Sequence, residues 1–585
     1  MAAYVAPTTD IAFLLKEVFD FDGLTQTLPG YEDMDSDLAV SVLEEAGKFC
    51  AEVLEPLNRS GDEEGSTLKD GVVSTPKGFA EAYKAFVEAG WGGLSGDTEF
   101  GGQGLPSAIQ LLFDEMVTST NMAFGLFSGL THGAVEAINH HASQELKERY
   151  LPKMISGEWT GAMALTEPSA GTDLGLLTTR AVPLGDGSFR INGTKIFISS
   201  GDQDVSDNIV HLVLARLPDA PKGVKGISLF LAPKYLVNED GSLGARNGMS
   251  VGSLEHKMGI RAQPTCMMNY DGATAWMVGE PGRGLNAMFT MMNNERLFVG
   301  IQGLGIAEAA NQKATSYALE RLQGRGIDGA PGPVPIIQHP DVRKMLLTGR
   351  SFIDAARALG IWTAFQMDIA SHHPDPEERK RADGFVALLT PVVKAAFTDG
   401  GLETAISSQM VFGGHGYIRE WGMEQYVRDV RITQIYEGTN GVQAMDLVGR
   451  KLPMENGQLT ARFIALLRQD LQDALSSPAA EHVAKATGKA LDQLERATAQ
   501  LMANQSDQSA AGVAATDYLR LFGLTASGWM WTKMAAKAPP DTPLGKRKLA
   551  CADFYADRIL PQAAALEVAI AAGSASTMAL HKELF

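Results

Sequence analysis

The stretch QIYEGTNGVQ, from Gln434 to Gln443, places a single carboxylate beside a turn. Glu437 follows Tyr436 and precedes Gly438-Thr439-Asn440-Gly441. A glycine carries no side chain that would keep a ligand away from the backbone. The stretch therefore predicts a carboxylate, Glu437, presented next to an open loop, which suits the abstraction of a proton.

Composition limits the classes of protein that this chain can belong to. At 585 residues it is too long for one hydrophobic core and should divide into several domains. A hydrophobic content of 45% and a charged content of 20% are ordinary for a soluble globular protein. The net charge of −19 argues against nucleic acid or an anionic membrane as the main partner, because such partners need clustered Lys and Arg.

The cysteines and the first residues indicate where the protein works. Cys50, Cys266 and Cys551 are far apart and form no CxxC pair, so we expect a reducing cytoplasm, no disulfide framework and no metal site. The opening segment has Asp10 and Lys16 where a signal peptide would be apolar. No run of 18 apolar residues occurs, so no membrane span is expected.

Hydrophobic periodicity divides the chain into five parts. An arm covers residues 1–36, and apolar residues at three- and four-residue steps predict a helical domain over 37–160. Short segments such as KIFI and GISLFLAP, rich in β-branched and aromatic residues, predict a β-domain over 161–283. Asp186-Gly187 and Asn192-Gly193 within it are typical of tight turns.

The helical period returns over 284–455, interrupted by a predicted surface loop from Gly324 to Pro335. Residues 456–585 are richer in Ala, Leu and Gln and predict four more helices, at 460–476, 481–504, 514–537 and 545–572. The chain has no GxGxxG after a strand and no GxxxxGK[ST], so neither common nucleotide-binding motif is present.

Three segments in a fixed order carry a resemblance to a known family. GAMALTEPSAGTDLG (161–175), KIFISSG (195–201) and QIYEGTNGVQ together resemble the acyl-CoA dehydrogenase family of flavoenzymes, from about Leu38 to Lys451. The resemblance implies an α+β multidomain fold with an N-terminal α-helical domain, a middle β-barrel-like domain and a C-terminal four-helix bundle. Residues 456–585 would form an additional helical domain.

The same resemblance implies an activity. This activity is the FAD-dependent dehydrogenation of an acyl-CoA thioester to the trans-2-enoyl-CoA. Electrons would pass to electron-transfer flavoprotein, and the protein would be a homodimer. Glu437 matches the base that removes the α-proton. Glu295 lies where a minority branch carries its base, so the chain offers two candidates. We favour Glu437, with Glu295 an exposed or ion-paired helix residue.

Family positions also imply cofactor and substrate contacts. Phe197-Ile198-Ser199 stands where the family commonly has Trp-Ile-Thr, and an aromatic wall and a hydroxyl are retained. Arg321 matches an arginine that reaches the flavin diphosphate of a neighbouring subunit, and a guanidinium suits that anion. The full cofactor set is Met163, Leu165, Thr166, Gly171, Thr172, Phe197, Ile198, Ser199, Arg321, Gln338, Phe412, Gly413, Gly414, Thr439 and Gly441. The substrate set is Thr172, Asn293, Arg296 and Gly438.

The acyl group is less constrained by these motifs. The N-terminal arm and the C-terminal helices resemble a longer bacterial branch of the family, whose substrates include 3-(methylthio)propanoyl-CoA and ordinary fatty acyl-CoAs. A thioether chain and an alkyl chain of similar length both need an apolar slot. Two rival interpretations are an acyl-CoA oxidase, which passes electrons to O₂, and a non-catalytic relative with an assembly or protective role.

Overall fold

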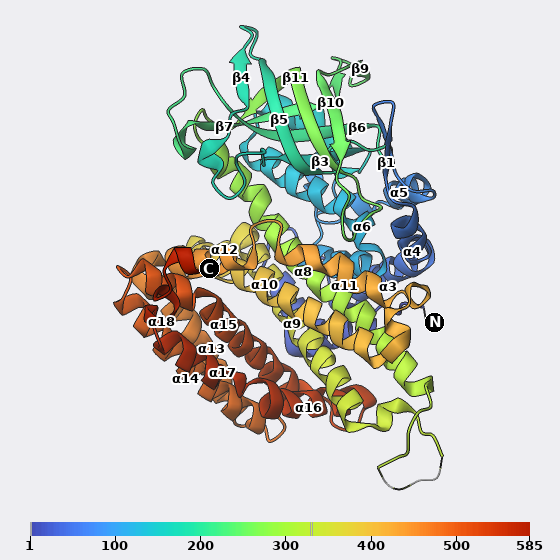
Figure 1. The fold of residues 1–585 in the computed structure, drawn as a ribbon, viewed down its shortest axis with the longest axis vertical. Coiled ribbons are helices and arrows are strands. Elements are labelled where there is room, and N and C mark those ends of the chain that lie inside the picture. The colour runs from blue at the N-terminus through green and yellow to red at the C-terminus, as the bar shows by residue number, and fades with distance from the viewer. Residues whose placement is uncertain (1–2, 328, 330–331) are drawn as a thin grey trace. The chain divides into compact units, whose positions relative to one another are not determined.

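The computed structural model describes residues 3–327, 329 and 332–585 (Figure 1). It consists of two compact units. The helical unit comprises Met1–Lys48, Pro106–Ser119 and Val299–Phe585, and the sheet unit comprises Phe49–Leu105 and Thr120–Phe298. Two long helices, α6 (Ser107–His141) and α8 (Gly284–Glu320), contribute residues to both units.

The sheet unit begins with helices and one unpredicted hairpin. A π-helical turn (Cys50–Leu54) leads into α4 (Glu55–Glu64), and α5 (Phe79–Glu88) and α7 (Gln144–Ile155) follow. Between α4 and α5, strands β1 (Thr67–Lys69) and β2 (Val72–Ser74) pair antiparallel, where only helix was expected. Asp70 and Gly71 both have positive φ, 52° and 77°, as a two-residue hairpin turn requires.

The middle of the sheet unit is a sheet that closes on itself. Its strands are β3 (Trp159–Ala164), β4 (Arg180–Pro183), β5 (Phe189–Ser199), β6 (Asn208–Arg216), β7 (Ile227–Pro233), β10 (Met249–Leu254) and β11 (Thr265–Val278). Pairing runs β11–β5–β4–β6–β7 and returns from β7 to β11. Closure of this circuit confirms the predicted β-barrel-like domain. A separate hairpin joins β8 (Tyr235–Val237) to β9 (Leu243–Arg246).

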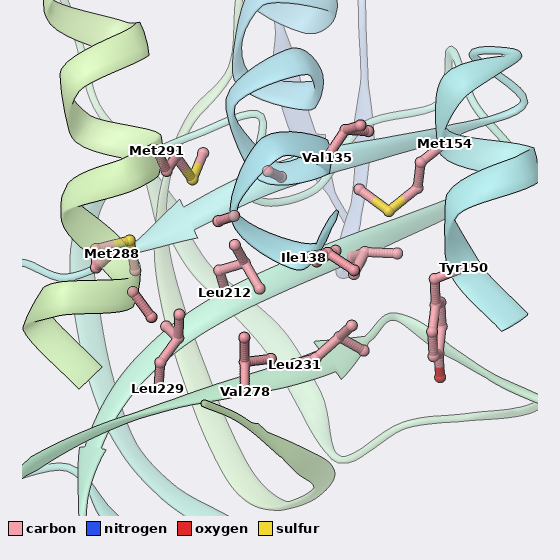
Figure 2. Close-up of a cluster of buried hydrophobic side chains, with 14 of the residues drawn as sticks. Val135, Ile138, Tyr150, Met154, Leu212, Leu229, Leu231, Val278, Met288 and Met291 are labelled. Carbon is pink, nitrogen blue, oxygen red and sulfur yellow. The ribbon is translucent and has the colours of Figure 1, made fainter. Parts of the chain in front are cut away.

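Helices cover one face of this sheet. Val135 and Ile138 of α6, Met154 of α7 and Met288 and Met291 of α8 surround side chains from β6, β7 and β11 (Figure 2). The labelled strand side chains are Leu212, Leu229, Leu231 and Val278. A second apolar cluster, which includes Ile191, Ile209 and Phe230, fills the other side of the same strands. Strands buried on both faces explain the near-continuous apolar runs of β6 and β7.

One of the two predicted turns is wrong. Asp186-Gly187 does connect β4 to β5, whereas Asn192-Gly193 lies inside β5. A Cβ added at Gly193 would lie 2.3 Å from Oγ1 of Thr179, so this glycine serves a close approach of two backbone segments.

The helical unit is built from the arm, a bundle and the C-terminal helices. The arm contains α1 (Thr8–Phe13), a π-helical turn (Leu14–Val18) and α2 (Phe21–Thr25), and α3 (Ser36–Phe49) follows. The bundle uses parts of α6 and α8 with α9 (Pro340–His372), α10 (Pro376–Val411), α11 (Met423–Arg431) and α12 (Asn440–Asp446). The predicted loop 324–335 lacks regular structure where it is described, and Asp328, Ala330 and Pro331 lie outside the described residues.

The C-terminal helices pack directly on the bundle. They are α13 (Gln458–Ala474), α14 (Glu481–Ala503), α15 (Gln508–Lys537), α16 (Pro543–Phe554), α17 (Gln562–Ala571) and α18 (Ala575–Met578). Trp529 of α15 lies edge-on to Trp362 of α9 with 5.0 Å between ring centroids. The single helix predicted over 545–572 is interrupted between α16 and α17, where Pro561 lacks the N–H that a continuous helix would use.

Among the described residues, α10 alone is long and apolar enough to cross a membrane by length and composition. Of its most apolar 18-residue window, 67% is buried inside the structure. The core helix of a bundle meets the same criterion, so α10 is weak evidence for a membrane span.

Candidate active site

In the sheet unit, two of the predicted cofactor segments lie side by side. The backbone carbonyl of Thr166 accepts a hydrogen bond from the backbone N–H of Ile196, with 2.9 Å between N and O. TEPSAGT thus runs next to the end of β5, although 30 residues separate Thr166 from Ile196 in the sequence. The hydroxyl-bearing Thr166 and the KIFIS segment are thereby brought together, as a shared flavin contact would require.

A β-bulge turns Phe197 outward. Cys266 pairs with Ile198 and Met268 pairs with Lys195, so two residues of β5 oppose one of β11. Phe197 has a left-handed φ of 60°, and its side chain is 60% exposed. Bulges redirect side chains, and a non-glycine residue in this conformation is often found at a functional site. The bulge presents a flat aromatic ring that a flavin could cover.

A buried ion pair stiffens the loop that follows Thr166. Nζ of Lys195 lies 2.9 Å from Oε1 of Glu167 and 2.9 Å from the carbonyl oxygen of Leu165. The backbone N–H groups and hydroxyls of Thr178 and Thr179 donate to the same carboxylate, at distances of 2.6 to 3.0 Å. Both members of the pair are almost fully buried. These bonds fix Leu165 and Glu167, the residues on either side of Thr166.

The protonation states of this pair follow from burial and attraction. Burial alone would raise the pKa of Glu167, but Lys195 and the threonine donors outweigh burial and lower the pKa to about 2. For Lys195, burial outweighs the attraction of Glu167 and lowers the pKa to about 8. Both groups are thus charged at neutral pH. Sequence reasoning did not single out Lys195, although a lysine among apolar strand residues was a usable signal.

The other predicted cofactor residues of the sheet unit are of two kinds. Leu165 and Ile198 are buried in the apolar clusters, and Met163 packs against one of them, so mainly their backbone is left for a ligand. Gly171 and Thr172 are exposed, and a Cβ added at Gly171 would meet no atom within 4 Å. Ser199 is half-buried at the end of β5. The last three residues leave room for a bound group.

Helix α8 carries the remaining candidates of the sheet unit. Asn293 is exposed, whereas Arg296 is buried, with 8% of its surface exposed. Glu295 is only 2% exposed, so the expectation that it could be an exposed residue is wrong. It packs against α6, because a Cβ added at Gly133 would lie 2.7 Å from its Oε1. A glycine facing the carboxyl group makes room for it inside the helix pair.

In the helical unit, the loop after α8 brings two predicted cofactor residues near each other. Leu322 and Pro335 form an isolated β-bridge, and the N–H of Ile336 donates to the carbonyl of Arg321 at 2.9 Å. Gln338 follows two residues later. Arg321 and Gln338 are both exposed, so this pairing brings the backbone segments that carry a guanidinium and an amide next to each other.

An aromatic cluster supports the Phe412–Gly414 loop. The ring of Phe412 stacks on Tyr317 of α8 with 4.1 Å between centroids, and the ring of His415 stacks on Trp421 with 4.4 Å between centroids. The hydroxyl of Tyr317 lies 2.9 Å from Nδ1 of His415. These contacts give His415 a structural role. The side chain of Phe412 is buried, so it shapes the loop from within.

The two glycines of this loop face open space. Cβ atoms added at Gly413 and Gly414 would meet nothing within 4 Å, and Gly413 has a left-handed φ of 56°. Tyr317 and Trp421, which the sequence reasoning did not identify, hold the loop with these two glycines in place through Phe412 and His415. Tyr317 lies one helical turn before Arg321, so the loop and the arginine are fixed by the same helix.

The segment that contains Glu437 is half-buried at the start of α12. Glu437 has a left-handed φ of 56° and Gly438 one of 84°. The hydroxyl of Tyr436 donates to the side chain of Gln302, which is fully buried on α8. Thr439 is exposed and caps α12, with Oγ1 accepting from the N–H of Val442 at 3.3 Å. Gly441 is also exposed.

Comparison with known proteins assigns the chain to a family. Family models described as the N-terminal, middle and C-terminal domains of acyl-CoA dehydrogenase match residues 37–158, 162–273 and 282–452. A model described as acetyl-CoA dehydrogenase C-terminal like matches 463–581. The chain belongs to the acyl-CoA dehydrogenase family. Membership confirms the expected fold, the enzyme class and its FAD cofactor.

Individual relatives extend over nearly the whole chain. The chain is 42% identical to 3-methylmercaptopropionyl-CoA dehydrogenase of Ruegeria pomeroyi, covering 96% of this chain and 97% of that protein. It is 34% identical to a butyryl-CoA dehydrogenase of Syntrophomonas wolfei, covering 99% of each. The solved structure of Caenorhabditis elegans ACDH-11 in complex with C11-CoA matches with a TM-score of 0.77 at 20% identity, covering 95% and 92%. The C-terminal helices are therefore a shared part of these longer folds.

Among the described residues, 3–327, 329 and 332–585, no group of three His, Cys, Asp or Glu side chains is placed to hold a metal ion. The predicted cofactor residues fit a flavin better than a metal ion. They offer an exposed aromatic ring, hydroxyl donors, a surface guanidinium and glycines open to approach.

Proposed function

We propose that the protein dehydrogenates 3-methylmercaptopropionyl-CoA across Cα–Cβ and releases the trans-2-enoyl thioester. The observation that carries the activity is Glu437, a half-buried carboxylate in a left-handed turn at the position of the family base. The relative of 42% identity supports the methylthio substrate. A straight-chain acyl-CoA of similar length is the second candidate, favoured by the butyryl-CoA relative.

Each residue set has a distinct task in this proposal. Glu437 accepts the α-proton of the thioester, because an ionised carboxylate placed beside the substrate can act as a general base. Bound FAD supplies the capacity to accept a hydride, which no side chain has. Phe197 offers an apolar surface to the ring system, and Thr166 and Ser199 offer hydroxyl donors. Arg321 and Gln338 offer a cation and an amide to the diphosphate end.

A panel of acyl-CoA thioesters tests the substrate. Purified enzyme is assayed with methylthiopropanoyl-, butanoyl-, pentanoyl- and octanoyl-CoA and an artificial electron acceptor. The proposal expects the highest kcat/KM for the methylthiopropanoyl thioester. Equal values for methylthiopropanoyl- and pentanoyl-CoA, which have chains of the same number of heavy atoms, would instead indicate a broad short-chain enzyme.

The electron acceptor in this proposal is electron-transfer flavoprotein. FAD bound by these residues would need an electron acceptor after each turnover, and family members of the dehydrogenase type use this flavoprotein. An acyl-CoA oxidase would use O₂ and release peroxide. Stopped-flow reoxidation separates the two, since slow reoxidation in air with rapid reoxidation by electron-transfer flavoprotein supports the dehydrogenase. Absence of flavin bleaching by any acyl-CoA would favour the non-catalytic interpretation.

We also propose a homodimer in the cytoplasm. Ile406, Met410, Tyr417 and Ile418 expose apolar surface at the end of α10 and in the following loop, with exposed fractions from 41% to 86%. A second copy of the chain would remove this surface from water.

The proposed location, the cytoplasm, is consistent with the three cysteines. Cys50, Cys266 and Cys551 are all buried, and none of them forms a disulfide. Cell fractionation tests the location.

A further inference from the structure

The backbone of Glu437 is in a conformation that needs support. Glu437 and Gly438 both have left-handed φ angles, 56° and 84°. The second position suits glycine, but the first is sparsely populated by residues with a side chain. Such a conformation persists where surrounding contacts determine it. The contacts that hold this turn therefore also set the direction of the carboxylate.

Gln443 makes the most direct of these contacts. Its side-chain Nε2 donates to the carbonyl oxygen of Glu437 at 3.0 Å and lies 3.3 Å from the carbonyl oxygen of Gly438. Gln443 is fully buried in the first turns of α12. One amide group thus bonds both carbonyls of the left-handed pair. A Cβ added at Gly438 would lie 2.8 Å from the same Nε2, which shows how closely the side chain fits the turn.

A carboxylate on α10 holds both sides of the same loop. Oδ1 of Asp399 accepts from Nε2 of Gln434 at 2.6 Å and from Nδ2 of Asn440 at 2.7 Å. Asn440 in turn accepts from Nζ of Lys394, a fully buried lysine, at 2.9 Å. Because these anchors lie before and after Glu437, they fix the ends of the loop. Gln443 bonds the carbonyl groups of Glu437 and Gly438 between these two anchors.

We propose that Gln443 is a positioning residue for the base. It holds the Glu437–Gly438 backbone in the left-handed turn and so directs the carboxylate towards the α-proton. The inference rests on the proposed function, since it has meaning only if Glu437 is the base. Misplacement of a reacting group by about 1 Å lowers a rate by about 100-fold. Loss of the amide should therefore reduce proton abstraction without removing the cofactor.

The test uses the full-length holoenzyme and Gln443→Met, which keeps the length of the side chain and removes the donor. Flavin reduction is followed by stopped-flow with normal and α-deuterated thioester. We expect the rate to fall about 10- to 100-fold and the α-deuterium isotope effect to rise, because proton transfer becomes more difficult. Flavin content should be unchanged and KM should change by less than about threefold. A merely structural role would not raise the isotope effect.

Two further variants separate the possible outcomes. Gln425→Met on α11 is the matched control, because Gln425 is also a buried glutamine of the helical unit, bonded to Asp429 at 3.1 Å. It should retain the wild-type rate and isotope effect. If Gln443→Met loses its flavin, Gln443→Glu is used to test the positioning role. Glutamate has nearly the same shape as glutamine, but its ionised carboxylate cannot donate a hydrogen bond to the carbonyl of Glu437. The same loss of rate and rise in isotope effect is expected.

The outcomes for the two assignments differ. A normal rate and isotope effect in a folded Gln443 variant, with an inactive Glu437→Gln, would overturn the positioning role and leave the base intact. An active Glu437→Gln would overturn the proposed base itself. Loss of flavin from both Gln443 variants would show that Gln443 maintains the fold, which also contradicts the positioning role.

Discussion

Lys548 on α16 and Asp354 on α9 form a fully buried ion pair, with 2.8 Å between Nζ and Oδ2. Lys548 also lies 2.7 Å from Oδ1 of Asp10 in the N-terminal arm. Asp354 pairs with Arg350 on the preceding turn of α9, and Arg350 in turn pairs with Glu308 of α8 at 2.7 Å. The arm, the bundle and the C-terminal helices are thus joined by one buried network. The C-terminal helices therefore pack on their own chain.

Removal of Lys548 should be strongly destabilising. Lys548→Ala removes the cation that Asp354 and Asp10 share in a buried site, while Arg350 and Arg547 remain beside these carboxylates. Removing one partner of a buried pair costs about 3 to 5 kcal/mol when the other is left uncompensated, so we expect the loss to lie near the lower end of that range. Urea unfolding of the purified protein measures the loss. Lys485→Ala is the control, because Lys485 pairs with Glu481 on the surface, and it should leave the midpoint unchanged. Equal midpoints for both variants would show that the buried network contributes little.

The carboxylate of Glu167 should make the sheet unit sensitive to acid. Its folded pKa of about 2 lies below its ordinary value of 4.5, so its contribution is present above about pH 4.5 and is lost as the pH falls towards 2. A shift of that size corresponds to about 3 kcal/mol. Glu167→Gln should lower stability at pH 7 and flatten its dependence over this range.

Thermal unfolding between pH 2 and pH 7 checks this dependence. Glu145→Gln, which alters an exposed carboxylate on α7, should reproduce the wild-type curve. A Glu167→Gln curve parallel to that of the wild type would mean that the ion pair with Lys195 does not carry the acid sensitivity.

The order of domains followed from hydrophobic periodicity, but several local features did not. Asn192-Gly193 has the letters of a turn, and only the tertiary contact with Thr179 explains its place inside β5. The bulge at Phe197 depends on the register between β5 and β11, which a single segment does not determine. Local residue patterns predict local structure, whereas register and close approaches depend on distant partners.

In the candidate site too, the residues in short motifs could be predicted from the sequence, whereas their contacts with other segments could not. Glu437, Thr166 and Phe197 could be selected from short motifs because each stands in a recognisable sequence context. Gln443 lies in the same stretch, yet its bond to the carbonyl of Glu437 depends on the path of the turn. The burial of Glu295 could not be read from its spacing on α8, because it depends on the facing Gly133 of α6.

Charge at the apolar surface of α10 should prevent dimer formation. Met410 is 65% exposed, and Met410→Glu would place a carboxylate where the proposed second copy needs an apolar contact. Size-exclusion chromatography with light scattering should show a dimer for the wild type and a monomer for the variant. Val568→Glu on α17, where the valine is 71% exposed, should remain a dimer. A flavin-loaded monomeric wild type would contradict the proposal.

The central claim is that Glu437, and not Glu295, removes the α-proton. The most direct measurement is the rate of flavin reduction by acyl-CoA in Glu437→Gln and Glu295→Gln, each checked for full flavin content. A general base contributes about 100- to 10,000-fold, so Glu437→Gln should lose at least that much while the bound flavin stays yellow. Glu295→Gln should retain most of its activity. An active Glu437→Gln together with an inactive, flavin-loaded Glu295→Gln would place the base on α8 and contradict the account.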